Sequence, residues 1–175
     1  SLPDCYADLG FRTISTNPCG EIPLCPYDSC RLLAINLYSY VKHPFTPQAE
    51  FDYDLFRIHV AKAQRIMDDI IDLEMEKIDA ILSKIDSDPE TEEVKWPERH
   101  LWEKIRTKTL RGRRTGVGTT AEGDMLAAMG LRYGTPEATA FSEDVHRRLA
   151  LAAYGSSVEM AAERGAFEVF DADRE

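Results

Sequence analysis

Hydrophobic residues recur along most of the chain at the three- and four-residue spacings of amphipathic helices. The longest stripe starts just after Asp52 and runs for about 30 residues: Phe56, Val60, Ala63, Met67, Ile71, Met75, Ile78, Leu82 and Ile85. Residues three or four apart share one face of a helix, so this pattern predicts a long helix with one buried face. The acidic residues between them are interpreted as a solvated surface: Asp68, Asp69, Asp72, Glu74 and Glu76.

A second helix is expected from Pro97 to about Leu110, after a polar, proline-containing loop at 86–93. Proline suits the first turn of a helix because the backbone N–H groups there have no helical partner.

Two more helices are predicted beyond the glycine-rich segment 111–118, which is interpreted as a tight turn feeding a helix. Thr119 and Glu122 have the spacing of a capping box, which would open a short helix ending near residue 130. The last long helix should begin at Thr135 and end at Gly165. Its apolar stripe is Phe141, Val145, Leu149, Ala152, Ser156 and Met160.

The first third of the chain is irregular, because prolines interrupt it repeatedly. One strand is predicted there, at 34–41, from its β-branched and aromatic residues and their rough alternation. The organisation expected is a single partial domain over 1–175, with a loop and strand region at 1–50 and a mainly helical region at 51–175.

Charge and hydropathy exclude several classes of protein. The formal net charge is 21 − 31 = −10, which disfavours a nucleic-acid polymer as partner, since phosphate neutralisation supplies most of that affinity. A single nucleotide stays possible, because one phosphate needs only a local pocket of donors. No apolar run approaches the ~18–20 residues of a membrane span, and no targeting segment is visible. We therefore expect a cytoplasmic protein, and both chain ends suggest a piece of a longer polypeptide.

Four cysteines fall within the first thirty residues, at positions 5, 19, 25 and 30. Their irregular gaps do not match the close pairs of a zinc site, and structural disulfides belong to secreted chains. Clustered thiols of this kind are more typical of redox or catalytic chemistry.

Asn17, Cys19 and Glu21 occupy alternate positions, so in an extended segment their side chains could converge on one small ligand. A thiol, a carboxylate and an amide together offer a hydrogen or proton relay, a general base and a fixed hydrogen-bonding group. Spacing alone, however, favours a simpler interpretation, a proline-rich loop with an incidental cysteine.

Longer motifs change that balance. The run TNPCGEIPL at 16–24 resembles the active-site finger loop of ribonucleotide reductase large subunits. The resemblance continues through PYDSCRLLAINL at 26–37, GRRTGVG at 112–118 and MGLRYGTPEA at 129–138. Ordered blocks over most of the chain are far more specific than one tripeptide.

The resemblance implies an α/β fold: a mainly helical fragment of a ten-stranded α/β barrel, with a few short strands and a finger loop. It also implies that Cys19 holds a transient thiyl radical, Glu21 is the base for the ribose 3′-hydroxyl, and Asn17 hydrogen-bonds the ribose hydroxyls. Cys30 matches one of the two cysteines that reduce the 2′ position, while its partner lies upstream in the family. Cys5 and Cys25 are interpreted as bystanders.

The Asn-Pro-Cys-Gly-Glu wording is more similar to adenosylcobalamin-dependent members than to those with a separate iron subunit. Glu21 argues against the glycyl-radical branch, which lacks this carboxylate. The implied partners are a ribonucleotide, the remainder of the reductase chain, a dithiol reductant such as thioredoxin, and a second copy in a homodimer. The isolated chain is expected to be inactive, because the phosphate loop and the second thiol are absent.

Two other interpretations stay open: a non-catalytic acidic helical interaction module and a carboxylate-bridged metal bundle. Glu143 and His146 have a Glu-x-x-His spacing, but a di-iron bundle needs two such motifs. The segment 111–118 lacks the Gly-Lys-Ser/Thr ending of a phosphate loop. Arg113 and Arg114 are instead expected to face a carboxylate-rich neighbour.

Overall fold

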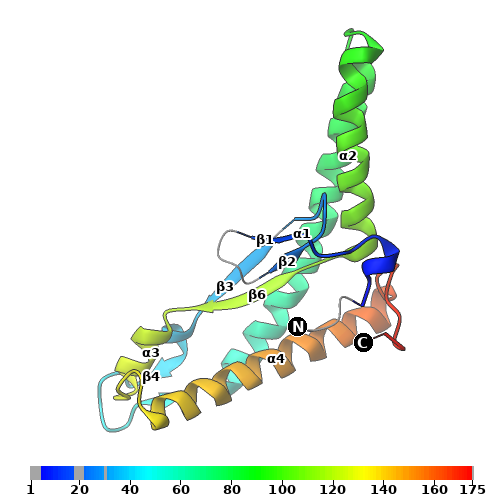
Figure 1. Cartoon of the computed structure of the whole chain (residues 1–175). Coiled ribbons are helices and arrows are strands. Elements are labelled where there is room, and N and C mark those ends of the chain that lie inside the picture. The colour runs from blue at the N-terminus through cyan, green and yellow to red at the C-terminus, as the bar shows by residue number, and fades with distance from the viewer. Residues whose placement is uncertain (1–4, 18–21, 30, 175) are drawn as a thin grey trace. The chain divides into compact units, whose positions relative to one another are not determined.

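The computed structural model describes residues 5–17, 22–29 and 31–174 (Figure 1). The chain divides into two compact units, which are described separately. The first comprises residues 1–31, 68–115 and 165–175, and the second comprises 32–67 and 116–164. The long helix α1 (Tyr53–Ser87) contributes residues to both.

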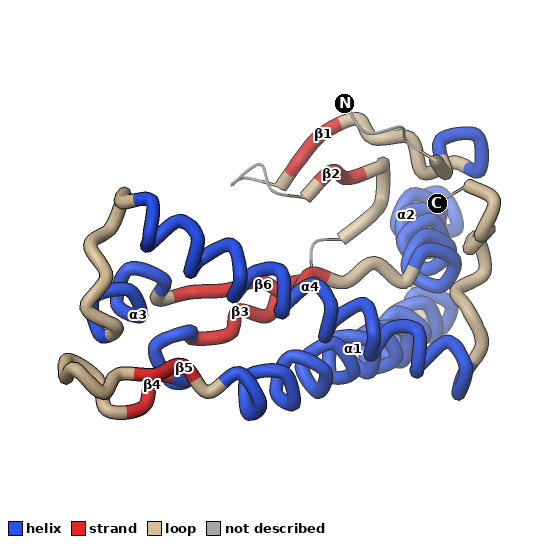
Figure 2. Tube along the Cα trace, turned by 90° about the horizontal axis from the view of Figure 1, so that it is seen from below, coloured by secondary structure: helices blue, strands red, loops and turns tan. Residues whose placement is uncertain are grey.

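The second unit contains a parallel strand pair, β3 (Leu32–Asn36) and β6 (Gly116–Thr120), which lie side by side in Figures 1 and 2. The register runs from Leu32 opposite Gly116 to Asn36 opposite Thr120. Parallel strands cannot be joined by a tight turn, and here the intervening chain passes through α1 and α2 (Glu92–Gly112). This β–α–β connection is the kind from which α/β barrels are built.

The core of the second unit is apolar and is formed mainly by helices. Besides β3, β6 and part of α1, the unit contains the 3₁₀ turn η2 (Leu37–Tyr40), the short antiparallel pair β4 (Val41–Lys42) and β5 (Glu50–Phe51), and the helices α3 (Glu122–Ala128) and α4 (Pro136–Arg164). The fully buried side chains at its centre include Leu37, Phe56, Val60, Met125 and Val145. Burying side chains of this size contributes about 1.5–3 kcal/mol each.

The first unit is built on two antiparallel helical segments, the C-terminal part of α1 and all of α2. Ile71, Ile78 and Ile85 of α1 are buried, as the apolar spacing predicted. Ion pairs join the two helices along their length, for example Arg106 with Asp79 at 2.6 Å. The unit also contains the 3₁₀ turn η1 (Ala7–Leu9) and a hairpin of β1 (Ser15–Thr16) and β2 (Pro23–Leu24).

The helices α1 and α4 follow the sequence pattern closely. The expected helix after Asp52 is α1, which begins at Tyr53. The last helix begins at Pro136, where the Thr135 hydroxyl accepts a hydrogen bond from the Ala138 N–H at 3.3 Å, and it ends before Gly165. Gly165 has φ +88°, a left-handed conformation that suits glycine after a helix end.

The strand predicted at 34–41 is wrong in its second half. The strand ends at Asn36, and residues 37–40 form η2. The 3₁₀ turn buries Leu37 and Tyr40 together, which an alternating strand cannot do because those positions would face opposite sides.

The predicted start of the second helix at Pro97 is also wrong. The helix begins at Glu92, after Thr91 in an extended conformation, so Pro97 lies inside it. The acidic Glu92 and Glu93 occupy the first turn, where negative charge is favourable.

The predicted capping box does not form, and segment 111–118 does not turn directly into a helix. Thr119 lies in strand β6, and the residue before α3 is Ala121, with φ +60° and no side-chain cap. Thr119 instead contacts the His146 ring at 3.3 Å, and Glu122 accepts a hydrogen bond from Ser142. His146 is therefore a hydrogen-bonded helix residue.

Among the described residues, no helix combines the length and the apolar character needed to cross a membrane.

Candidate functional site

The candidate site is carried by the β1–β2 hairpin. Thr16 pairs with Pro23 and Ser15 with Leu24 in antiparallel register. The Asn17 N–H donates to the Ile22 carbonyl at 3.1 Å, and the Ile22 N–H donates to Asn17 Oδ1 at 2.9 Å. Asn17 is only 6% exposed, so its side chain closes the hairpin from inside.

Residues 18–21 connect these two arms, and they include Cys19 and Glu21. Both lie outside the described residues, as does Cys30. The convergence of Asn17, Cys19 and Glu21 on one ligand therefore stays a prediction. What the described residues add is the placement of Asn17 at the point where the arms meet.

Arg114 holds the outgoing arm of the hairpin. Its guanidinium Nη1 donates to the Pro23 carbonyl at 3.1 Å, and its Nε lies 3.3 Å from the Asp28 carboxylate. The Asp28 side chain is 1% exposed and also accepts hydrogen bonds from the Ser29 N–H at 2.9 Å and the Cys25 thiol at 3.6 Å.

Arg31, which directly follows Cys30 in the sequence, is buried, and each of its three guanidinium nitrogens donates a hydrogen bond. Its guanidinium pairs with Glu74 of α1 and donates to the buried Thr109 hydroxyl at 2.9 Å. It also donates to the Arg114 carbonyl at 3.2 Å. A buried cation with three partners fixes the backbone at this point, since breaking any one contact leaves a costly unpaired group.

No role was predicted for Arg31, although an arginine beside an apolar strand region is a usable signal. Charged residues are almost never fully buried unless they are paired. Arg31 at the start of the run Leu-Leu-Ala-Ile therefore indicates a buried ion pair, but the sequence does not identify the partner.

The expectation that Arg113 and Arg114 face carboxylates is confirmed. Arg113 binds Asp68 and Asp72 of α1, each at 2.8 Å, and Arg114 binds Asp28. The interpretation of the α1 acids as a solvated surface is wrong for Asp68, whose side chain is 15% exposed.

Gly112 permits the close packing beside this ion-pair cluster. A Cβ at this position would lie 2.6 Å from Cε1 of Phe11, a ring that is 1% exposed. Cations of Lys108 and Arg114 lie 4.4 Å and 5.4 Å from the centre of that ring. The glycine is therefore required by the approach of Phe11.

Cys25 and Cys5 are free thiols, and Cys25 is buried. Burial raises the pKa of the Cys25 thiol, and the nearby Asp28 carboxylate raises it further. A thiol with a raised pKa is a poor nucleophile. This environment agrees with the interpretation of Cys25 as a bystander.

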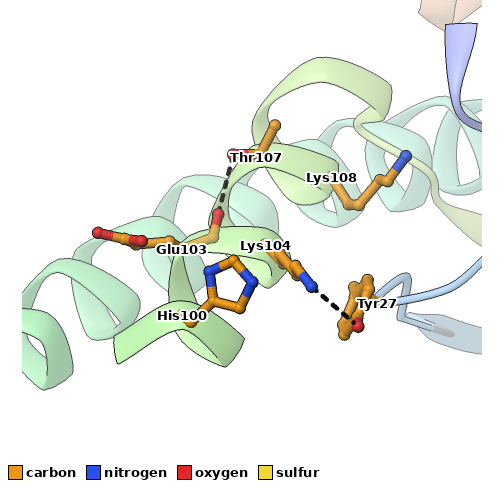
Figure 3. A pocket seen from close by; sticks show the side chains of 6 residues that line it. All are labelled: Tyr27, His100, Glu103, Lys104, Thr107 and Lys108. Atoms are coloured by element: carbon orange, nitrogen blue, oxygen red, sulfur yellow. Dashed lines mark hydrogen bonds between the residues drawn. The ribbon is translucent and has the colours of Figure 1, made fainter. Parts of the chain in front are cut away.

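A shallow hollow of about 340 Å³ lies beside α2 in the same unit. It is lined by Tyr27, His100, Glu103, Lys104, Thr107 and Lys108. Figure 3 shows the Lys104 ammonium directed at Tyr27, whose hydroxyl is 3.3 Å away. In the described part of the chain, no group of three or more histidine, cysteine or acidic side chains is placed to hold a metal.

Comparison with known proteins gives these residues a context. The sequence model of the ribonucleotide reductase barrel domain matches residues 10–175. The chain belongs to this family. The match includes the hairpin, both long helices and the β3–β6 strand pair.

Curated relatives agree with this assignment. The chain is 32% identical over 163 residues to the vitamin B12-dependent ribonucleoside-diphosphate reductase of Mycobacterium tuberculosis, covering 93% of this chain and 19% of the relative. It is 33% identical over 153 residues to the enzyme of that name from Thermoplasma acidophilum, covering 87% and 16%. A ribonucleoside-diphosphate reductase large subunit of African swine fever virus is 24% identical, covering 89% and 16%. The chain thus spans about a fifth of the length of the relatives it matches.

Proposed function

We propose that this chain supplies the thiyl-radical active site of a ribonucleotide reductase that converts ribonucleotides to deoxyribonucleotides. The observation that carries the proposal is the Asn-Pro-Cys-Gly-Glu sequence at 17–21. It joins the two arms of a hairpin closed by the buried Asn17 amide. The family match over residues 10–175 supports it.

The chemistry follows from the residue types. The Cys19 sulfur, as a thiyl radical, takes the hydrogen atom from ribose C3′ and becomes a thiol. Glu21 accepts the 3′-hydroxyl proton while the 2′-hydroxyl, protonated by one of the two reducing thiols, leaves as water, and Glu21 returns its proton to the 3′-oxygen once C2′ has been reduced. Cys30 and a second thiol supply two electrons and two protons and end as a disulfide. The hydrogen atom then returns from Cys19 to C3′, which regenerates the thiyl radical.

Asn17 is proposed to orient the ribose through its amide N–H₂ group. Its Oδ1 already accepts the Ile22 N–H, which leaves both N–H donors of the amide to offer to sugar hydroxyls. The same bond fixes the side chain in one orientation. A group held rigidly before substrate arrives positions the substrate with little loss of entropy.

We infer that the parallel pair β3–β6 forms two neighbouring strands of the family's ten-stranded barrel. The match to the barrel-domain model and the helical connection between parallel strands support this. In α/β barrels, catalytic groups lie on loops that a rigid strand scaffold positions. The whole catalytic domain would thus be completed by sequence outside these 175 residues.

The proposed cofactor is adenosylcobalamin, a form of vitamin B12, because the Mycobacterium and Thermoplasma relatives are named vitamin B12-dependent enzymes. When bound, it would supply the radical. The hollow beside α2, at about 340 Å³, is much too small to enclose a corrinoid, and no described residue is assigned to holding one. A dithiol protein such as thioredoxin is the proposed reductant, and a homodimer is the proposed assembly.

The test is product formation by the full-length polypeptide that contains this chain. Separate reactions would receive a ribonucleoside diphosphate or triphosphate, with adenosylcobalamin and dithiothreitol, and deoxynucleotide would be measured by chromatography. We expect product from at least one substrate, and none when adenosylcobalamin is omitted. No product from either substrate in the complete mixture would overturn the proposed function, and product without the cofactor would overturn the cofactor assignment.

A further inference from the structure

Arg114 contacts two separate segments of the chain that flank the proposed reacting residues. Its side chain donates to the Pro23 carbonyl in β2, on the arm that leaves the hairpin. The same guanidinium pairs with Asp28, two residues before Cys30. Its own carbonyl accepts a hydrogen bond from Arg31, one residue after Cys30. One residue thus links both segments.

The ion pair between Arg114 and Asp28 is costly to break. The carboxylate is 1% exposed, while the Arg114 side chain is 29% exposed. A buried carboxylate that loses its cation pays the full desolvation penalty, so the pair resists separation. Ser29 and Cys25 also donate to this carboxylate, but both are uncharged.

The backbone that carries Arg114 is itself held in place. Arg113, the preceding residue, caps the end of α2 with φ +40°, and its N–H donates to the Thr109 carbonyl at 3.1 Å. Its guanidinium binds Asp68 and Asp72 on α1. Arg114 therefore projects from a point fixed to two helices.

We propose that Arg114 is a positioning residue that sets the spacing between the hairpin carrying Cys19 and Glu21 and the segment carrying Cys30. This inference rests on the proposed function. Both segments must act on adjacent carbons of one ribose, so their relative placement controls the reaction. A misplacement of about 1 Å can lower a rate by roughly 10²-fold.

The first test measures the hairpin without reference to catalysis. In the full-length polypeptide, hydrogen exchange is followed by mass spectrometry in peptides covering residues 12–24. Arg114→Gln should speed exchange in these peptides roughly tenfold, the effect of losing a hydrogen bond to a charged group. Arg111→Gln is the matched control, because Arg111 lies on the same helix end and pairs with the exposed Glu168.

Arg114→Lys is the second variant, used because Arg114→Gln leaves Asp28 unpaired and can lower overall stability. Lysine keeps the charge beside Asp28 but has a single ammonium where arginine has a planar fork. We expect native-like exchange in the rest of the chain and an intermediate increase in residues 12–24. Unchanged exchange there in both Arg114 variants, or an equal increase in Arg111→Gln, would overturn the proposal.

The second test separates positioning from substrate binding. In the full-length reductase, Arg114→Lys should lower kcat roughly 10- to 10²-fold with KM within about twofold of wild type. An unchanged kcat, or a change confined to KM, would contradict a positioning role. If wild-type protein makes no deoxynucleotide, the proposed function fails, while the exchange experiment still decides whether Arg114 fixes the hairpin.

Discussion

Replacing Gly112 by alanine should destabilise the chain, although alanine is the better helix former. Gly112 is the last residue of α2, and an added methyl would lie 2.6 Å from Cε1 and 3.2 Å from Cζ of Phe11. Carbon atoms pack best at about 3.5–4.0 Å, so the ring would have to retreat by roughly 1 Å. Phe11 is buried, and Lys108 lies over its face, so the ring has little room to move.

The magnitude follows from two opposing effects. Overpacking a filled core costs about 1–3 kcal/mol. Alanine in place of a helical glycine recovers roughly 0.5–1 kcal/mol. The expected net loss is about 0.5–2 kcal/mol. For a chain of this size each kcal/mol lowers Tm by roughly 2–4 °C.

Thermal and urea unfolding followed by circular dichroism would measure this loss. Gly155→Ala is the control, because Gly155 lies within α4 and a Cβ there meets no atom within 4 Å. That variant should gain about 0.5–1 kcal/mol. The two glycine substitutions are therefore expected to change the free energy of unfolding in opposite directions.

A double-mutant cycle with Phe11→Leu tests whether the clash with the ring causes the loss. Leucine lacks the ring atoms that the new methyl meets. The double variant should therefore lose less free energy of unfolding than the two single variants lose together, by roughly 0.5–3 kcal/mol. Strict additivity, or a Gly112→Ala variant as stable as wild type, would refute the packing argument.

Three further outcomes are expected. Glu21→Gln in the full-length enzyme should lower turnover ~10²–10⁴-fold, the usual value of a positioned base, and near-normal turnover would remove Glu21 from that role. Without external thiol, the enzyme should make roughly one turnover and leave Cys30 in a disulfide with a cysteine outside this chain; peptide mapping that finds Cys30 reduced would exclude it. Hydrogen bonds from Arg99 and Lys95 lower the pKa of Glu92 from 4.5 to about 2. Because its folded pKa is depressed, its stabilising contribution is present above pH 4.5 and is lost as pH falls toward 2, so Tm should fall across that window, and a constant Tm would contradict the sign.

Local periodicity predicted the long helices because their burial depends on spacing along one segment. The stripe from Phe56 to Ile85 needed no knowledge of what covers it. Strand β6 was missed for the opposite reason. Its sequence, Gly-Val-Gly-Thr-Thr, is short and contains two glycines, which weaken a strand, and it is a strand because it pairs with β3, whose residue Leu32 lies opposite Gly116.

The candidate site, too, was predictable from the sequence only in part. The Asn-Pro-Cys-Gly-Glu segment was identified as a motif, and the prolines around it indicated an irregular region, but not the hairpin. The network that holds the hairpin was only partly predictable. The sequence indicated that Arg113 and Arg114 face carboxylates, but Arg31 and Glu74 are 43 residues apart, and no local pattern predicts which acid on α1 receives the buried guanidinium.

Cys19, among the cysteines of this chain, is proposed to carry the radical chemistry. The most direct test compares Cys19→Ser with Cys25→Ser in the full-length polypeptide, measuring deoxynucleotide formation under identical conditions. Cys25→Ser replaces a buried thiol with a raised pKa and should retain most of the turnover. Cys19→Ser should abolish turnover, because an alkoxyl radical is not accessible there. Product formation by Cys19→Ser at a rate comparable to Cys25→Ser would contradict the assignment of the radical to Cys19.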